Sequence, residues 1–73
     1  MEQLALNKFV RLKRKSLKMT QKEMSEKSGV GIRFIRELER GKQTLKMDKV
    51  NQVLDLFGYE LGPIETTWSN EES

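Results

Sequence analysis

The sequence predicts a mainly α-helical fold of four short helices, followed by one short strand. Apolar residues recur at helical spacing in three stretches, and a capping motif marks the start of a further helix. Gly29, Gly41 and Gly58 stand where the second, third and fourth helices are expected to end. Residues 59–64 instead alternate apolar with polar or small residues, which is the period of a strand.

The first helix is expected from Gln3 to Leu17. Leu6, Val10 and Leu17 fall at helical spacing, and basic residues occupy much of the remaining surface. We therefore expect an amphipathic helix whose apolar face contributes to the core.

The second helix is expected over residues 21–27, because a capping box precedes it. Thr20 and Glu23 have the S/T-x-x-E spacing, in which the threonine side chain accepts a hydrogen bond from the Glu23 amide and the Glu23 carboxylate accepts one from the Thr20 amide. Met24 is the expected core residue. Gly29 ends this helix, since glycine adopts the left-handed conformation without a steric penalty.

The third helix is expected from Ile32 to Arg40, after a short turn. Ile35 and Leu38 form its apolar face, and Phe34 beside them is expected to pack against the core. The fourth helix is expected over residues 47–57, because its apolar residues recur at short intervals. These residues are Met47, Val50, Val53, Leu54 and Phe57.

The strand predicted at residues 59–64 has no partner strand elsewhere in the sequence. Because a buried strand needs its amides and carbonyls paired, the economical partner is the same segment of a second copy, in an antiparallel two-fold ribbon. The dimer contacts would then come from Tyr59, Leu61 and Ile64. The alternative is a coil packed on the fourth helix. Residues 65–73 are expected to form a flexible acidic tail.

The composition excludes several classes of function. A chain of 73 residues supports one small core. It contains no His and no Cys, so Cys/His zinc sites, disulfides and His-based acid–base chemistry are unavailable, and we expect no enzyme and no cofactor. No apolar run approaches the about 20 residues of a membrane span, and no secretory signal follows Met1. A cytoplasmic protein without a membrane partner is expected.

The net charge of +3 conceals a strong asymmetry along the chain. Residues 1–46 hold thirteen Lys or Arg and five acidic residues, giving +8, whereas residues 47–73 hold one Lys and six acidic residues, giving −5. A basic body of this kind is typical of a protein that binds a polyanion such as nucleic acid. A solvated basic helix face is the alternative interpretation.

The segment 21–40 has the order of a helix-turn-helix motif: a capped helix, Gly29 at the turn, and a second helix with Ile35 and Leu38 facing inward. In this motif the first helix lies across the phosphate backbone, while the second presents its N-terminal side chains to base edges in the major groove. The sequence therefore predicts a DNA-binding domain over residues 1–58.

From residue 4 to about residue 64, the chain resembles the Xre/Cro-type, lambda repressor-like helix-turn-helix domain of bacterial and phage repressors. The family's I-x-x-L-E-x-G run is matched by Ile35, Leu38, Glu39 and Gly41. Three features are most similar to the HipB-type antitoxins: the sequence of residues 34–41, the Thr44-Leu45 start to the fourth helix, and the strand expected directly after that helix.

The resemblance implies roles for ten DNA-contacting residues. At the start of the second helix, Gln21 would bond a phosphate or base, and Lys22 would add a phosphate contact. On the third helix, base edges would be met by Ile32, Arg33 and Arg36. Behind it, backbone phosphates would be held by Arg40, Lys42, Gln43, Thr44 and Lys46.

The chemistry of the recognition helix departs from the family pattern at its start. Gly31 and Ile32 stand where hydrogen-bonding residues are frequent, and Ile32 could instead tuck against the second helix. Arg33 and Arg36 can each bond guanine O6 and N7, whereas Ile32 offers only apolar contact to a thymine methyl. Specificity is therefore expected to depend on the two arginines and on DNA shape. The resemblance also implies a structural ion pair between Arg14 and Glu39.

The leading functional hypothesis is a homodimeric, sequence-specific transcriptional repressor on a palindromic operator, with recognition helices about 34 Å apart. The HipB resemblance implies an antitoxin that represses its own operon and neutralises a HipA-like kinase toxin. Trp68 lies in a tail that is not expected to bury it within the domain, so it is either a chance aromatic or an anchor for the toxin. The alternatives are a stand-alone phage-type or housekeeping Xre regulator, and a protein-interaction adaptor that binds no DNA.

Overall fold

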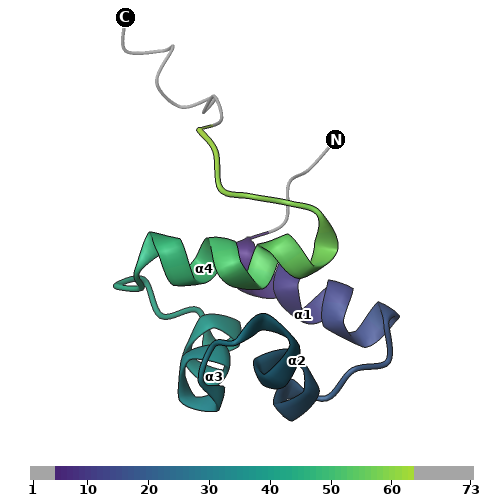
Figure 1. The fold of residues 1–73 in the computed structure, drawn as a ribbon. Coiled ribbons are helices and arrows are strands. Elements are labelled where there is room, and N and C mark those ends of the chain that lie inside the picture. The colour runs from purple at the N-terminus through teal and green to yellow at the C-terminus, as the bar shows by residue number, and fades with distance from the viewer. Residues whose placement is uncertain (1–4, 64–73) are drawn as a thin grey trace, which may run out of the picture.

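Four α-helices follow one another in the predicted order (Figure 1). The computed structural model describes residues 5–63, so the predictions for Ile64 and Trp68 lie outside the described residues. The helices are α1 (Leu6–Ser16), α2 (Gln21–Ser28), α3 (Ile32–Arg40) and α4 (Met47–Leu54), and a 3-10 turn, η1 (Asp55–Phe57), continues α4. The mainly α-helical prediction is confirmed for this part of the chain.

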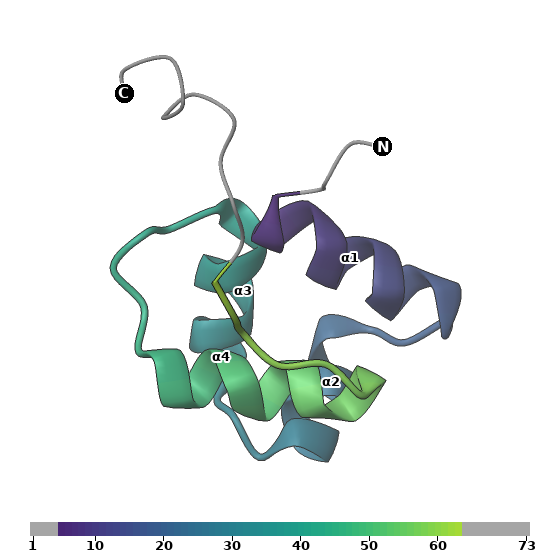
Figure 2. The ribbon, with the colours of Figure 1, turned by 90° about the horizontal axis from the view of Figure 1, so that it is seen from above.

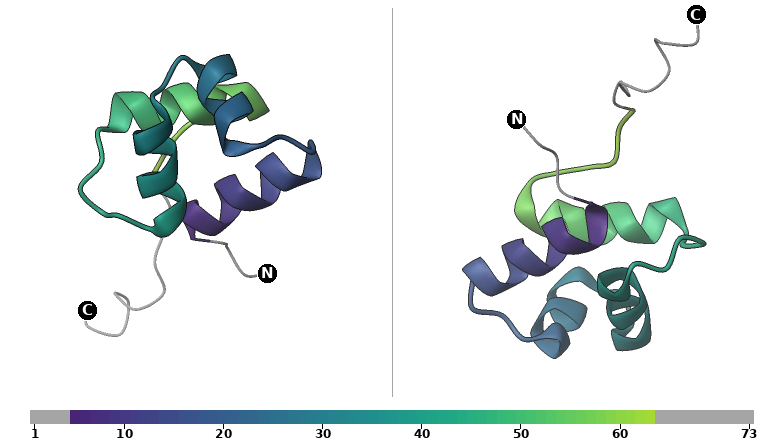
Figure 3. Two further views of the ribbon diagram at one scale, coloured as in Figure 1. Left: turned by 90° about the horizontal axis from the view of Figure 1, so that it is seen from below. Right: turned by 180° about the vertical axis from the view of Figure 1, so that it is seen from behind.

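The helices divide into two sides of the molecule. Seen from above, α1 and α4 run along opposite edges (Figure 2), and α2 and α3 lie beneath them (Figure 1). α3 packs against both α1 and α2, and α4 packs against α2. The coloured chain begins and ends on the side away from α2 and α3 (Figure 3). The helix-turn-helix unit therefore has an open face directed away from both ends of the described chain.

The core contains one or more side chains from every helix and one from the turn between α2 and α3. Its buried apolar members are Val10, Met24, Val30, Ile35, Leu38, Val50, Val53 and Leu54. Leu6, Phe9, Phe34 and Phe57 pack around this centre while remaining partly exposed. The predicted inward faces of the helices are therefore confirmed at these positions.

Two apolar residues that the periodicity assigned to inward faces are exposed. Leu17 is 56% exposed because α1 ends at Ser16, so the chain has left the helical path before the leucine is reached. Met47 is 68% exposed because it is the first residue of α4, at the edge of the packed region. Both predictions were wrong, since spacing alone does not reveal where a helix leaves the core.

The helix ends also differ in detail from the expected ones. Ala5 is extended, with φ −62° and ψ 152°, so α1 begins at Leu6 and not at Gln3. The fourth helix changes to 3-10 geometry at Asp55 before it ends at Gly58. α3 spans the predicted residues.

The turn between α2 and α3 is fixed by local and distant hydrogen bonds. The capping box is confirmed, with the Glu23 amide 3.0 Å from Thr20 Oγ1 and the Thr20 amide 2.8 Å from a Glu23 carboxylate oxygen. Gly29 has φ 78°, a left-handed conformation, and its amide donates to the Ser25 carbonyl. Gln52 of α4 donates to the Ser28 carbonyl at 2.9 Å. These bonds set the angle at which α3 leaves α2.

Residues 59–63 form no strand with any other part of the described chain. They run back over α4, where the Leu61 amide donates to Asn51 Oδ1 at 2.7 Å (Figure 2). The Tyr59 ring meets the Phe9 ring edge to face at 4.9 Å, and the Lys13 ammonium lies over both rings. The segment therefore packs as a coil within one chain, while its pairing with a second copy remains a prediction.

Candidate DNA-binding surface

The outward face of α3 carries a stripe of arginines. Arg33, Arg36 and Arg40 are exposed, while Ile35 and Leu38 on the opposite face are buried. Spacings of three and four residues place the arginines along one side of the helix. α3 therefore presents positive charge to solvent along its whole length.

Most of the other predicted contact residues are also exposed. Lys22 lies at the start of α2, and four more follow α3 in the loop leading to α4: Lys42, Gln43, Thr44 and Lys46. Gln21 and Ile32 are half-buried, so each offers less surface to a ligand than the exposed residues do. Phe34 packs against the core as expected.

A buried carboxylate holds the arginine face in place. Glu39 is 3% exposed and accepts hydrogen bonds from Arg14 Nε at 2.6 Å, from Arg14 Nη2 at 3.0 Å and from Gln21 Nε2 at 3.1 Å. Arg14 also donates to the Met19 carbonyl at 2.9 Å. We call Arg14, Gln21 and Glu39 the Glu39 junction; it links α1, the start of α2 and the end of α3, and it confirms the expected ion pair.

The junction shifts the protonation equilibria of its own members. Burial alone would raise the pKa of Glu39, but the hydrogen bonds from Arg14 and Gln21 and the charges of Arg14 and Arg11 outweigh it, so the pKa lies below its usual range. The hydrogen bond to Glu39 in turn raises the pKa of Arg14. Both groups therefore remain charged at neutral pH.

A basic hollow of about 370 Å³ opens beside the Glu39 junction. Its lining residues are Arg11, Arg14, Lys15, Gln21, Arg36, Glu39 and Arg40. Five of these seven side chains are cationic, and they come from α1 and α3. The hollow joins the arginine stripe of α3 to the basic edge of α1, which suits a polyanion that crosses from one helix to the other.

Arg11 is a member of this surface that the sequence analysis missed. Its Nη2 donates to the Glu39 carbonyl at 3.0 Å, and its side chain is 48% exposed. The available signal was its spacing, since Arg11 and Lys15 are four residues apart on one helix. The opposite edge of α1 differs, because Lys13 lies over aromatic rings there.

Glu37 is a second residue that the prediction passed over. It follows Arg33 by four residues on α3, and its carboxylate lies 3.5 Å from Lys42 Nζ. A carboxylate on a recognition helix can accept a hydrogen bond from cytosine N4, whereas it repels phosphate. Its position on α3 was the signal that could have identified it.

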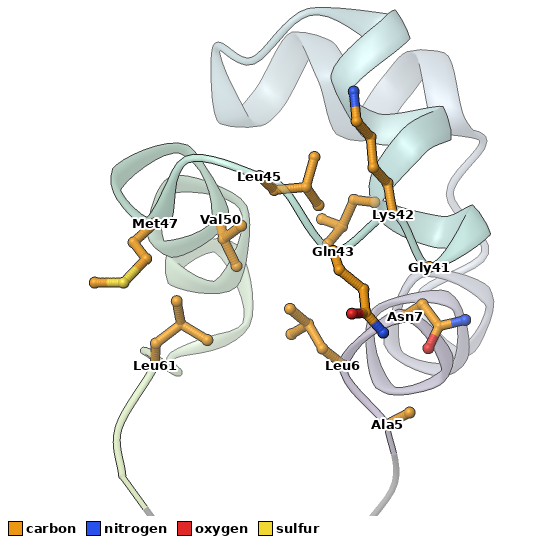
Figure 4. A pocket seen from close by; sticks show the side chains of 11 residues that line it. Ala5, Leu6, Asn7, Gly41, Lys42, Gln43, Leu45, Met47, Val50 and Leu61 are labelled. Carbon is orange, nitrogen blue, oxygen red and sulfur yellow. The ribbon is translucent and has the colours of Figure 1, made fainter.

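Gln43 is set apart from the arginine stripe. Its side chain lines an apolar hollow of about 360 Å³ and reaches toward Leu6 and Asn7, whereas Lys42 points away from that hollow toward α3 (Figure 4). This apolar hollow lies between the start of α1, the loop after α3, the start of α4 and the segment after η1. Its apolar lining consists of Ala5, Leu6, Leu38, Leu45, Met47, Val50 and Leu61.

The residues predicted for dimer contact differ in their surroundings. Tyr59 is 47% exposed, so its ring has surface available to a second copy. Leu61 is half-buried and lines the apolar hollow (Figure 4). Ile64 lies outside the described residues.

A capped helix, a glycine turn and a second helix that exposes a stripe of arginines define a helix-turn-helix domain of the DNA-binding class. Comparison with known proteins agrees with this geometry. The helix-turn-helix family matches residues 10–64, and the chain belongs to this family, in its Xre type. None of the helices in residues 5–63 is long and apolar enough to cross a membrane.

The chain is also similar to part of a curated protein. Over 50 residues, the chain is 46% identical to the uncharacterized HTH-type transcriptional regulator y4mF of Sinorhizobium fredii (strain NBRC 101917 / NGR234). The match covers 68% of this chain and 66% of that protein, just under two thirds of its length. No solved structure matches the chain significantly. The family match and the relative agree on a helix-turn-helix domain.

Proposed function

We propose that this protein is a homodimeric repressor that reads a palindromic operator with α3. The observation that carries this proposal is the arginine stripe of α3, exposed beside the basic hollow and held by the Glu39 junction. A helix of this kind fits the major groove, and the flanking cations neutralise the phosphates on either side.

The proposal divides the surface between bases and phosphates. Arg33 and Arg36, in the first half of α3, read guanine, and Ile32 beside them meets a thymine methyl. The backbone contacts come from Lys22, Arg40, Lys42, Thr44 and Lys46. Gln21 donates one amide N–H to Glu39, which leaves its second N–H free to donate to a phosphate and its amide oxygen free to accept from a base.

Residues 59–64 supply the dimer contact in this proposal, with Tyr59, Leu61 and Ile64 facing the second copy. A two-fold axis through this segment spaces the recognition helices by about one turn of duplex. The Leu61→Asp variant should dissociate the dimer in sedimentation while the helical circular dichroism is retained. A dimer that persists in this variant contradicts the strand model.

The resemblance to HipB-type antitoxins supports a finer proposal, in which the operator is the protein's own promoter and the partner is a HipA-like kinase toxin. Trp68 as an anchor for the toxin stays a prediction, since it lies outside the described residues. A stand-alone regulator has the same DNA surface and no toxin. Co-purification of a kinase-like protein encoded in the same operon distinguishes the two. Because both would bind DNA, we expect either of them in the cytoplasm, associated with the nucleoid.

A gel-shift titration tests the DNA-binding proposal. The probe is the duplex upstream of the protein's own gene, compared with a scrambled duplex of equal composition over a series of salt concentrations. The promoter should bind more tightly, and the logarithm of its affinity should fall linearly with the logarithm of salt concentration. Equal, weak binding of both duplexes at every salt concentration contradicts a sequence-specific repressor and favours the adaptor.

Two alanine variants assign that binding to a surface. Lys42→Ala removes an exposed cation from the proposed surface, whereas Lys49→Ala removes an exposed cation from α4. Only Lys42→Ala should weaken binding, and it should do so equally for all sequences. An equal loss in both variants contradicts the proposed orientation on DNA.

A further inference from the structure

The apolar hollow is unlike the rest of the surface, because its walls are apolar and open. Met47 on its rim is 68% exposed, and Leu6, Leu45 and Leu61 are only half-buried (Figure 4). Its volume of about 360 Å³ falls within the range of pockets that hold small ligands. Such a surface is suited to an apolar group that is not among residues 5–63.

We propose that the apolar hollow binds Trp68 of the same chain. Leu61 forms part of the hollow, and the hydrogen bond from its amide to Asn51 fixes the place where the chain leaves α4. Trp68 follows Leu61 by seven residues, which reach at most about 25 Å when extended. The indole is therefore tethered within reach of the hollow, because the tether begins at one of the residues that line it.

Few other residues of the C-terminal segment, positions 64–73, could occupy the hollow. Ile64 and Trp68 are the large apolar residues of positions 64–73, and the others are Glu, Thr, Ser and Asn. An indole provides a large apolar surface together with one N–H donor that needs a partner when buried. Gln43, which lines the hollow, has an amide oxygen that could accept this hydrogen bond (Figure 4).

Charge and tethering favour the same assignment. Lys46 lies between two lining residues, Leu45 and Met47, while Glu65, Glu71 and Glu72 flank Trp68 in the sequence. A short tether also gives the indole a high effective concentration at a site in its own chain, so no second copy is needed to hold it. A protein partner that requires Trp68 must therefore first remove it from the hollow.

Trp68 is the one tryptophan of the chain, so its fluorescence reports this contact directly. In the full chain without DNA, emission should be blue-shifted relative to the same chain in urea, and acrylamide should quench it less. Emission at the same wavelength in buffer and in urea overturns the proposal. The hollow would then be a site for residues 1–4, a second copy or another protein.

Matched variants show which surface holds the indole. Met47→Asp places a charge on the rim of the hollow at an exposed helix start, and it should move the emission to the red with no loss of helical circular dichroism. Leu12→Asp changes a 56% exposed leucine of α1 that does not line the hollow, and it should leave the emission unchanged. Gln43→Ala should weaken protection from acrylamide without affecting the fold. The same red shift in the Leu12 and Met47 variants overturns the assignment.

A dilution series separates the same chain from a second copy. Emission should stay constant as the protein is diluted through the range in which the dimer dissociates. A red shift that coincides with dissociation overturns the binding of Trp68 within one chain. The measurement contains no DNA, so a failure to bind the operator leaves its outcome unaffected, and a chain that is monomeric at every concentration should show the same constant emission.

Discussion

The Glu39 junction and the apolar hollow both include residues of α1 and α3, and they are built in opposite ways. In the junction, one buried carboxylate receives three hydrogen bonds from two side chains. In the apolar hollow, leucines and a methionine are partly exposed to solvent, and residues 5–63 do not fill the space. The first region is complete within the described chain, whereas the second is suited to an added group.

This difference matters for function because the two kinds of contact constrain geometry differently. A charged hydrogen bond is directional, so the junction fixes where α3 lies relative to α1 and α2. Apolar contact is non-directional and tolerates different occupants. α3 is therefore held by the directional contacts of the junction, while the apolar hollow lies beside residues 59–63.

The largest effect is expected from removing the carboxylate of the junction. Glu39→Ala leaves Arg14 and Gln21 without their partner, so the free energy of unfolding should fall by about 3–5 kcal/mol, as for other broken buried ion pairs. Urea denaturation followed by circular dichroism measures the loss.

Two comparisons make this result interpretable. Glu60→Ala changes an exposed carboxylate and should have almost no effect on stability. Glu39→Gln keeps an acceptor oxygen for Arg14, so its loss in the free energy of unfolding should lie between those of Glu39→Ala and Glu60→Ala. A loss of under about 1 kcal/mol in Glu39→Ala, the value of an exposed ion pair, contradicts the structural role of the junction.

The next largest effect concerns the arginine stripe that the junction supports. Arg33→Ala and Arg36→Ala should each cost about 1–3 kcal/mol of operator binding and relax the base preference at one position. Fluorescence anisotropy with single-base operator variants measures both quantities. An equal loss on every duplex shows instead that the arginine contacts a phosphate.

A smaller effect is expected from acid. The pKa of Glu39 is lower in the folded state than in the unfolded chain, so its contribution to stability is present above the unfolded pKa and is lost as the pH falls through the folded pKa. Stability should therefore decline with acid below about pH 4.5. Urea midpoints measured from pH 7 to pH 3 should fall less steeply for Glu39→Gln than for the natural chain, and parallel curves contradict this assignment.

The sequence allowed accurate prediction where the determining signal is local. Thr20 and Glu23 are three residues apart, and Gly29, Gly41 and Gly58 end helical segments through their own conformation, so these features were found. The expected pair of Arg14 and Glu39 came from the family resemblance. The stripe of Arg33, Arg36 and Arg40 follows from helical spacing on α3.

Features that depend on distant contacts were missed. The bonds from Gln21 and Arg11 to Glu39 span 18 and 28 positions, and no spacing rule connects these residues. The exposure of Met47 and Leu17 depends on where each helix leaves the core. The apolar hollow is assembled from four separate segments, so it becomes visible only when the fold is known.

The most direct test of the central claim is an NMR titration of the protein with its promoter duplex. The account predicts that the backbone amides shifted by DNA cluster at the start of α2, along α3 and in the loop at residues 42–46. Those at the end of α4 and at residues 59–63 should shift only slightly. Shifts concentrated on residues 59–63, with α3 unchanged, contradict the claim that α3 reads DNA.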